Sequence, residues 1–103
     1  MDLIDTQGPE TTDAGGPVVA PPGWAIEGGS LCRAWRFPTY MDGVAFAVAV
    51  AGRAEAADHH PDVEIGWRRV TVRWTSHDAG GVTARDVEMA QQTQSLAGTA
   101  LVD

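Results

Sequence analysis

The feature that most constrains how this chain can fold is a set of four short segments in which hydrophobic and polar residues alternate. These segments come in two pairs, and each pair is followed by a helical segment. Residues 24–27 and 31–37 flank Gly28-Gly29 and predict a β-hairpin with a Gly-Gly turn. Residues 63–67 and 70–74 alternate in the same way, which is typical of strands with one buried face. The pattern therefore predicts four strands, arranged as two antiparallel pairs.

Helical periodicity separates the two strand pairs and follows the second one. Thr39, with Asp42 three residues later, is typical of a helix start, and the helix is predicted to end near Ala57. Thr83 and Asp86 mark the start of a second helix. The order strand–strand–helix–strand–strand–helix predicts an α+β fold, a four-stranded antiparallel sheet with its helices packed on one face. The predicted inner faces comprise Val44, Phe46, Val48, Val50, Ala51 and Ala54 in the first helix, and Val87, Ala90, Gln94 and Ala97 in the second.

Residues 1–22 differ in composition from the rest of the chain. They contain four acidic residues, four of the six prolines and no arginine. Gly15-Gly16-Pro17 would break a helix that began upstream. We interpret residues 1–22 as a flexible acidic arm and residues 23–103 as one folded domain, which is long enough to bury a single core.

Charge and cysteine content exclude several classes of protein. The net charge of -7 argues against nucleic-acid binding, and the absence of lysine excludes a lysine Schiff base. Cys32 is the only cysteine, so it has no partner for an intrachain disulfide, and we expect it to be a small buried residue. We also expect no membrane span, because no apolar run reaches about 18 residues. The N-terminus is acidic and lacks a positive segment followed by an apolar core, so we expect no secretion signal and a cytoplasmic location.

The only three histidines lie at the ends of predicted elements. His59 and His60 are in the turn after the first helix, and His77 ends the fourth strand. An imidazole can give or take a proton near neutral pH, which suits general acid–base catalysis. Carboxylates nearby could orient the rings. Those expected at the same edge are Glu55, Asp58 and Asp86.

Each of these residues also has a purely structural interpretation. A histidine in a turn is often a polar cap, and Asp86 could simply be the capping partner of Thr83. Glu55 could be a solvated helix residue balanced by Arg53 or Arg85. A metal site is disfavoured, because adjacent histidines on an extended segment point apart and no His-x-x-x-His pair is present.

Taken together, the histidines and carboxylates and their spacing resemble the pattern of the pterin-4a-carbinolamine dehydratase family. This family is known in animals also as the dimerisation cofactor of a homeodomain transcription factor. The match is strongest from Ala54 to Ala90 and extends more weakly back to Trp24. The residues that carry it are Glu55, the triplet His59-His60-Pro61, Trp67, His77 and Asp86, with three, five, nine and eight residues between successive members.

The resemblance implies both a fold and a reaction. Family members have an α+β fold whose sheets pair at their edges into dimers and sometimes tetramers, so a homodimer or higher homo-oligomer is expected. They dehydrate 4a-hydroxytetrahydropterin to quinonoid dihydropterin, which recycles the tetrahydropterin used by aromatic amino-acid hydroxylases. The resemblance implies no metal and no organic cofactor, and a small-molecule pterin as the substrate.

The resemblance also suggests roles for individual residues. All three histidines are expected to be catalytic residues, with His59 and His77 as the acid–base pair and His60 acting mainly in substrate binding. Asp86 and Glu55 would orient the imidazoles. The residues expected to bind the substrate or support the histidines are Glu55, Asp58, Thr75, Ser76 and Asp86.

The sequence differs from the family in two places. Family members begin with a helix that residues 1–22 are not expected to form, and Val63 stands where an aromatic residue is common. Two other functions remain open. One is a non-catalytic dehydratase-like module that binds or assembles a protein partner, and the other is a relative that acts on a different heterocycle. The intact set of histidines favours an enzyme.

Overall fold

A computed structural model describes residues 18–98 and the backbone of Leu101–Val102. Most of the predicted acidic arm lies outside these residues. The part of the arm that is described contacts the domain, since Ala20 packs against the core and the Pro21 carbonyl accepts a hydrogen bond from the Trp24 amide at 3.0 Å.

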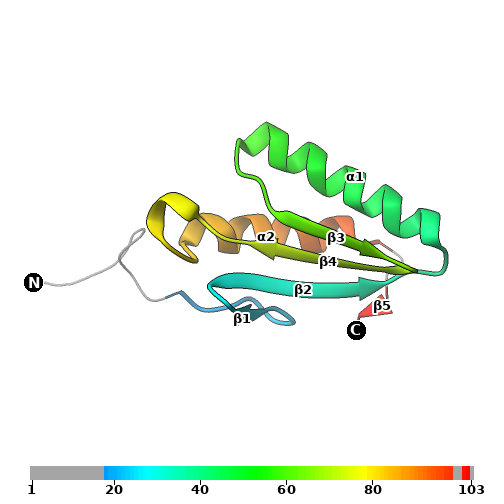
Figure 1. Cartoon of the computed structure of the whole chain (residues 1–103), viewed down its shortest axis with the longest axis horizontal. Helices are drawn as coiled ribbons and strands as arrows, with labels where there is room; N and C mark the ends of the chain where they lie inside the picture. The colour runs from blue at the N-terminus through cyan, green and yellow to red at the C-terminus, as the bar shows by residue number, and fades with distance from the viewer. Residues whose placement is uncertain (1–17, 99–100, 103) are drawn as a thin grey trace, which may run out of the picture.

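The elements follow the predicted order, with two short additions (Figure 1). A 3₁₀ turn, η1, precedes the second helix, and a two-residue strand, β5, lies near the C-terminus. The elements are β1 (Ala25–Glu27), β2 (Ser30–Arg36), α1 (Tyr40–Ala57), β3 (Asp62–Gly66), β4 (Arg69–Trp74), η1 (His77–Ala79), α2 (Ala84–Leu96) and β5 (Leu101–Val102). The structure confirms the predicted α+β fold.

The sheet is antiparallel at every pairing, with the order β1-β2-β4-β3. The central pair, β2 and β4, is in register from Leu31 opposite Trp74 to Arg36 opposite Arg69. The short strand β5 pairs with β2 at Trp35 and Arg36, beyond the stretch that pairs with β1. The four predicted strands are thus present, and β5 was not predicted because two residues show no periodicity.

Both helices pack on the same face of the sheet. Val70 and Trp74 of β4 point to this face, because a Cβ on Gly43 of α1 would lie 3.2 Å from Val70 Cγ2 and Thr93 of α2 bonds to Trp74. Gly43 therefore lets α1 approach the sheet closely. The buried core residues on the two inner strands are Leu31, Trp35, Val70, Val72 and Trp74.

The predicted inner face of α1 was partly wrong. Phe46, Val50 and Ala54 are buried as expected, but Val48 is 66% exposed and Ala51 is also exposed. Val48 is two positions from both Phe46 and Val50, which places it about 200° around a helix of 3.6 residues per turn. It therefore cannot share their face.

The predicted inner face of α2 needs a similar correction. Ala90 is buried as expected, but the buried face otherwise uses Met89, Thr93 and Asp86, and Gln94 is exposed. Gln94 accepts a hydrogen bond from Arg33, whose guanidinium lies 5.3 Å from the Trp35 ring. Within the described residues, neither helix has the length and apolar character needed to cross a bilayer.

Candidate functional site

The predicted site residues lie at one end of the sheet, where α1 ends, β3 begins, β4 ends and α2 begins (Figure 1). Helix α1 ends at Ala57, and the residue that caps it, Asp58, adopts a left-handed conformation with φ 51°. Its backbone N–H caps the carbonyls of Ala54 and Glu55, and the chain then turns into His59 and His60. This sharp turn directs His59 inward, so that it is buried, while His60 remains exposed.

A buried hydrogen bond joins His59 to Asp86. His59 Nε2 lies 2.6 Å from Asp86 Oδ1, and the Asp86 side chain is completely buried. The other oxygen, Oδ2, accepts from Ser76 Oγ at 2.7 Å and from the Thr83 backbone N–H at 2.9 Å. Asp86 thus caps helix α2 and bonds to His59 at the same time, so a capping role alone does not account for its contacts.

This arrangement determines which nitrogen of His59 carries hydrogen. Asp86 Oδ2 accepts hydrogen bonds from Ser76 and Thr83, and a carboxylate at the N-terminus of α2 has no hydrogen of its own to donate from Oδ1. His59 Nε2 is therefore the donor. In a neutral imidazole the other nitrogen then keeps its lone pair, so Nδ1 is the atom of His59 that can accept a proton.

The face of the His59 ring contacts Trp74, at the end of β4. The ring centroids are 5.6 Å apart and the planes are inclined by 22°, a stacked arrangement. The alternation in β4 indicates only that Trp74 is a core residue, and the sequence alone does not show its contact with His59. Trp74 lies three residues before His77, but no sequence pattern marks it as a contact of His59.

His60 pairs with Glu55 at the surface. His60 Nε2 lies 2.6 Å from Glu55 Oε1, and the two side chains are 54% and 80% exposed. Arg53 and Arg85 were the proposed partners of Glu55, but the structure shows both of them in contact with other groups. Arg53 reaches Gln92, and Arg85 donates to the carbonyls of Ala57 and Asp58.

His77 begins η1 and is exposed. The turn that carries it is held by two backbone hydrogen bonds between Ser76 and Gly81, at 3.0 and 3.2 Å. Gly80 closes the turn with φ 77°, a conformation that favours glycine. The Ser76 hydroxyl donates to Asp86, the same carboxylate that contacts His59. Asp86 therefore holds His59 directly and also fixes Ser76, the residue next to His77.

Two of the residues predicted to bind the substrate have other contacts, and a third is exposed. The Ser76 hydroxyl is buried between Asp86 and Thr83, and the Thr75 hydroxyl donates to the Gly29 carbonyl at 2.8 Å. The Asp58 side chain is exposed beside the histidines. Both hydroxyls are thus engaged with protein atoms, while the Asp58 carboxylate faces solvent.

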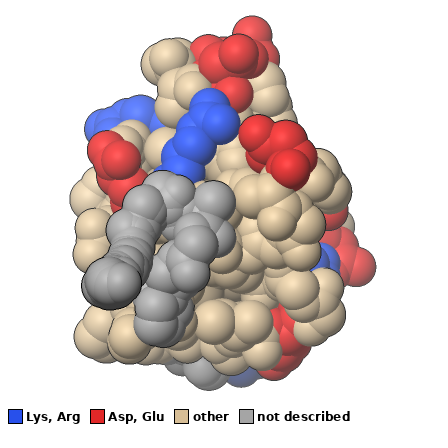
Figure 2. Space-filling view, turned by 90° about the vertical axis from the view of Figure 1, so that its left-hand side faces the viewer, with Lys and Arg blue, Asp and Glu red and all other residues tan. Residues whose placement is uncertain are grey.

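The donor set does not resemble a metal site. Within residues 18–98 and 101–102, no three histidine, cysteine or acidic side chains are arranged to hold a metal ion. Figure 2 shows the end of the molecule that carries the site, where acidic side chains are spread around the surface with few arginines between them. Such a surface is poorly suited to polyanions.

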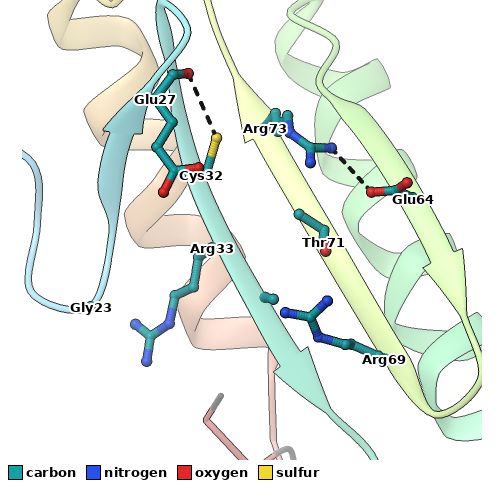
Figure 3. A pocket seen from close by; sticks show the side chains of 9 residues that line it. Gly23, Glu27, Cys32, Arg33, Glu64, Arg69, Thr71 and Arg73 are labelled. Atoms are coloured by element: carbon teal, nitrogen blue, oxygen red, sulfur yellow. Dashed lines mark hydrogen bonds and ion pairs between the residues drawn. The ribbon is translucent and has the colours of Figure 1, made fainter.

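A hollow of about 550 Å³ lies elsewhere, on the sheet face opposite the helices (Figure 3). Cys32 lies in it, and burial raises the pKa of this thiol. Arg73 spans part of the hollow to reach Glu64 at 3.3 Å. None of the predicted site residues lines it. The lining residues are Gly23, Glu27, Cys32, Arg33, Ala34, Glu64, Arg69, Thr71 and Arg73.

Comparison with known proteins agrees with the fold. A family model described as pterin 4 alpha carbinolamine dehydratase matches residues 10–96. Two relatives carry names that assign them provisionally to the pterin-4-alpha-carbinolamine dehydratases. The protein of Natronomonas pharaonis is 47% identical over 77 residues, 75% of this chain and 84% of the relative. That of Mycolicibacterium smegmatis is 48% identical over 75 residues, 73% of this chain and 80% of the relative.

Two solved structures have the same fold. One, titled a transcriptional coactivator/pterin dehydratase from Brucella melitensis, superposes with a TM-score of 0.70 at 30% identity, covering 75% of this chain and 84% of that one. The other, titled a pterin dehydratase-like RuBisCO assembly factor of the alpha-carboxysome, has a TM-score of 0.63 at 24% identity and covers 74% and 90%. By sequence match and by fold, the chain belongs to the pterin-4-alpha-carbinolamine dehydratase family.

Proposed function

We propose that this protein dehydrates 4a-hydroxytetrahydropterin by histidine acid–base catalysis. The observation that carries the proposal is the buried pair of His59 and Asp86, which leaves His59 Nδ1 as a proton acceptor. Family membership and the names of the relatives support the substrate class.

The reaction needs two proton transfers. The bond between C4a and the hydroxyl oxygen breaks as a proton is delivered to that oxygen, and water leaves. A proton is also removed from a ring nitrogen, and the electron pair left there forms the new double bond to C4a. The substrate therefore loses one water molecule, with no net oxidation or reduction.

The three histidines differ in ways that suit different roles. His59 is buried and held in one tautomer, which suits a base of fixed orientation. His77 is exposed on a firmly held turn, where it can exchange protons with solvent and serve as the acid. His60 is exposed and paired with Glu55, so its second ring nitrogen can bind the substrate at the surface.

The second candidate is a non-catalytic binding or assembly module. It is favoured by the dehydratase-like protein whose title names a RuBisCO assembly factor, which shares the fold. Burying a carboxylate is costly unless it is fully hydrogen-bonded, and here the carboxylate is directed at a histidine. A module with no catalytic function would need Asp86 only as the cap of α2 and not for its contact with His59, so we favour the enzyme.

The experiment follows decay of the carbinolamine by ultraviolet absorbance with wild-type protein and with the double variant His59→Ala/His77→Ala. We expect faster decay with wild type and a rate close to the uncatalysed one with the double variant. Equal rates for the two proteins would reject the catalytic proposal. Recovery of a stable protein partner together with absent turnover would favour the binding module.

The proposal extends to the physiological setting. We infer that the protein recycles tetrahydropterin for a pterin-dependent hydroxylase and acts as a homodimer or higher homo-oligomer. Light scattering coupled to size-exclusion chromatography tests the second statement. A mass equal to one 10.9 kDa chain at the assay concentration would contradict it.

A further inference from the structure

His59 has a second support that is separate from Asp86. The indole of Trp74 lies against one face of the imidazole, with 5.6 Å between ring centroids and 22° between planes. Trp74 is completely buried, and its Nε1–H donates to Thr93 Oγ1 at 3.0 Å. The indole is therefore fixed in position and cannot turn without breaking this hydrogen bond.

Thr93 is fixed in turn by helix α2. Its hydroxyl donates its single hydrogen to the Met89 carbonyl at 2.7 Å, which leaves its lone pairs for the Trp74 indole. Thr93 lies seven residues after Asp86 and both are buried, so the two occupy the same face of α2. Helix α2 thus holds His59 at the ring edge through Asp86 and at the ring face through Trp74.

We propose that Trp74, anchored by Thr93, is a positioning residue that sets the plane of the His59 imidazole. The χ2 torsion of histidine has a broad energy minimum, so a single hydrogen bond at Nε2 leaves the ring free to tilt about that contact. The flat indole removes this freedom and holds Nδ1 at one point. Its catalytic consequence rests on the proposed dehydratase function, whereas its effect on the His59 ring does not.

The test compares four single variants in steady-state kinetics, normalised to folded protein. Trp74→Leu should lower kcat by about 10- to 100-fold with a smaller change in KM. Trp74→Phe keeps a flat ring but loses the N–H that bonds to Thr93, so its kcat should lie between those of Trp74→Leu and wild type. Thr93→Val removes the acceptor for the indole and should resemble Trp74→Phe, because both variants lose the same hydrogen bond. The matched control is Trp35→Phe, because Trp35 is also completely buried but packs against Trp24 and Phe46.

A second readout does not depend on turnover. In ¹⁵N-labelled protein we expect wild type and the control Trp35→Phe to show one sharp Nε2–H signal for His59. Trp74→Leu and Thr93→Val should broaden or lose it. An unchanged signal and wild-type kcat in folded Trp74→Leu would overturn the proposal. If Trp74→Leu does not fold, an unchanged signal in Thr93→Val would do so. Absent turnover by wild type would reject the dehydratase function, and the signal would still decide the role of Trp74.

Discussion

Replacing Asp86 by asparagine should reverse the tautomer of His59. The asparagine oxygen can still accept the Thr83 backbone N–H, which preserves the helix cap, and the amide NH₂ then faces His59 Nε2. Two donors cannot bond to each other, so His59 must place its hydrogen on Nδ1 and its lone pair on Nε2. The ring keeps its position, but the nitrogen proposed to accept the proton no longer can.

Asp86→Asn should lower both the free energy of unfolding and kcat, and the size of each loss can be worked out from what Asp86 contacts. The carboxylate makes hydrogen bonds to His59, Ser76 and Thr83 in a fully buried site. A hydrogen bond to a charged group contributes roughly 1.5–3 kcal/mol, and two of the three keep a partner, so the free energy of unfolding should fall by about 2–3 kcal/mol. Loss of a correctly placed general base should lower kcat by roughly 10²- to 10⁴-fold.

The assay combines carbinolamine turnover with urea denaturation. The matched control is Ser76→Ala, which removes one bond to Asp86 Oδ2 but leaves the contact between Oδ1 and His59. This control should lose about 1–2 kcal/mol of stability and less than about tenfold in kcat. A folded Asp86→Asn protein with kcat near that of wild type would refute the tautomer argument.

Three further predictions concern separate parts of the molecule. His60→Ala should raise KM more than it lowers kcat, and change stability by less than about 1 kcal/mol, because its pair with Glu55 is exposed; a selective loss of kcat in steady-state kinetics would contradict the binding role. Gly43→Ala should destabilise the protein on thermal unfolding, because overpacking against Val70 costs about 1–3 kcal/mol and outweighs a gain of about 1 kcal/mol in helix propensity. Cys32 should react with iodoacetamide more slowly than a free thiol, and reach its maximum rate at higher pH, because burial raises its pKa; reaction at the free-thiol rate would count against this.

The fold could be predicted from the sequence because its periodicities are clear and agree with each other. Alternation placed Leu31, Trp35, Val70, Val72 and Trp74 on one face, and these are the residues that the helices cover. The same reasoning failed where a helix is apolar on more than one side. In α1 both sides carry valine and alanine, and only contact with the sheet decides which side is buried.

The candidate site could be predicted in its residues but not in its contacts. The sequence identified His59 and Asp86 but could not show whether Asp86 caps a helix or holds a histidine, because both roles suit the same position. Trp74 and Thr93 were missed because a buried aromatic residue and a helical threonine have no catalytic pattern. Their role depends on the distance between rings and hydroxyls, which only the folded chain specifies.

The central claim is that His59, held by Asp86, accepts a proton from a pterin carbinolamine. The most direct test is the rate of 4a-carbinolamine decay, followed by ultraviolet absorbance, with equal amounts of folded wild-type and His59→Ala protein. The account predicts a clear acceleration by wild type and a loss of at least about 10²-fold in kcat for the variant. Turnover by His59→Ala equal to that of wild type, or none by wild type itself, would contradict it.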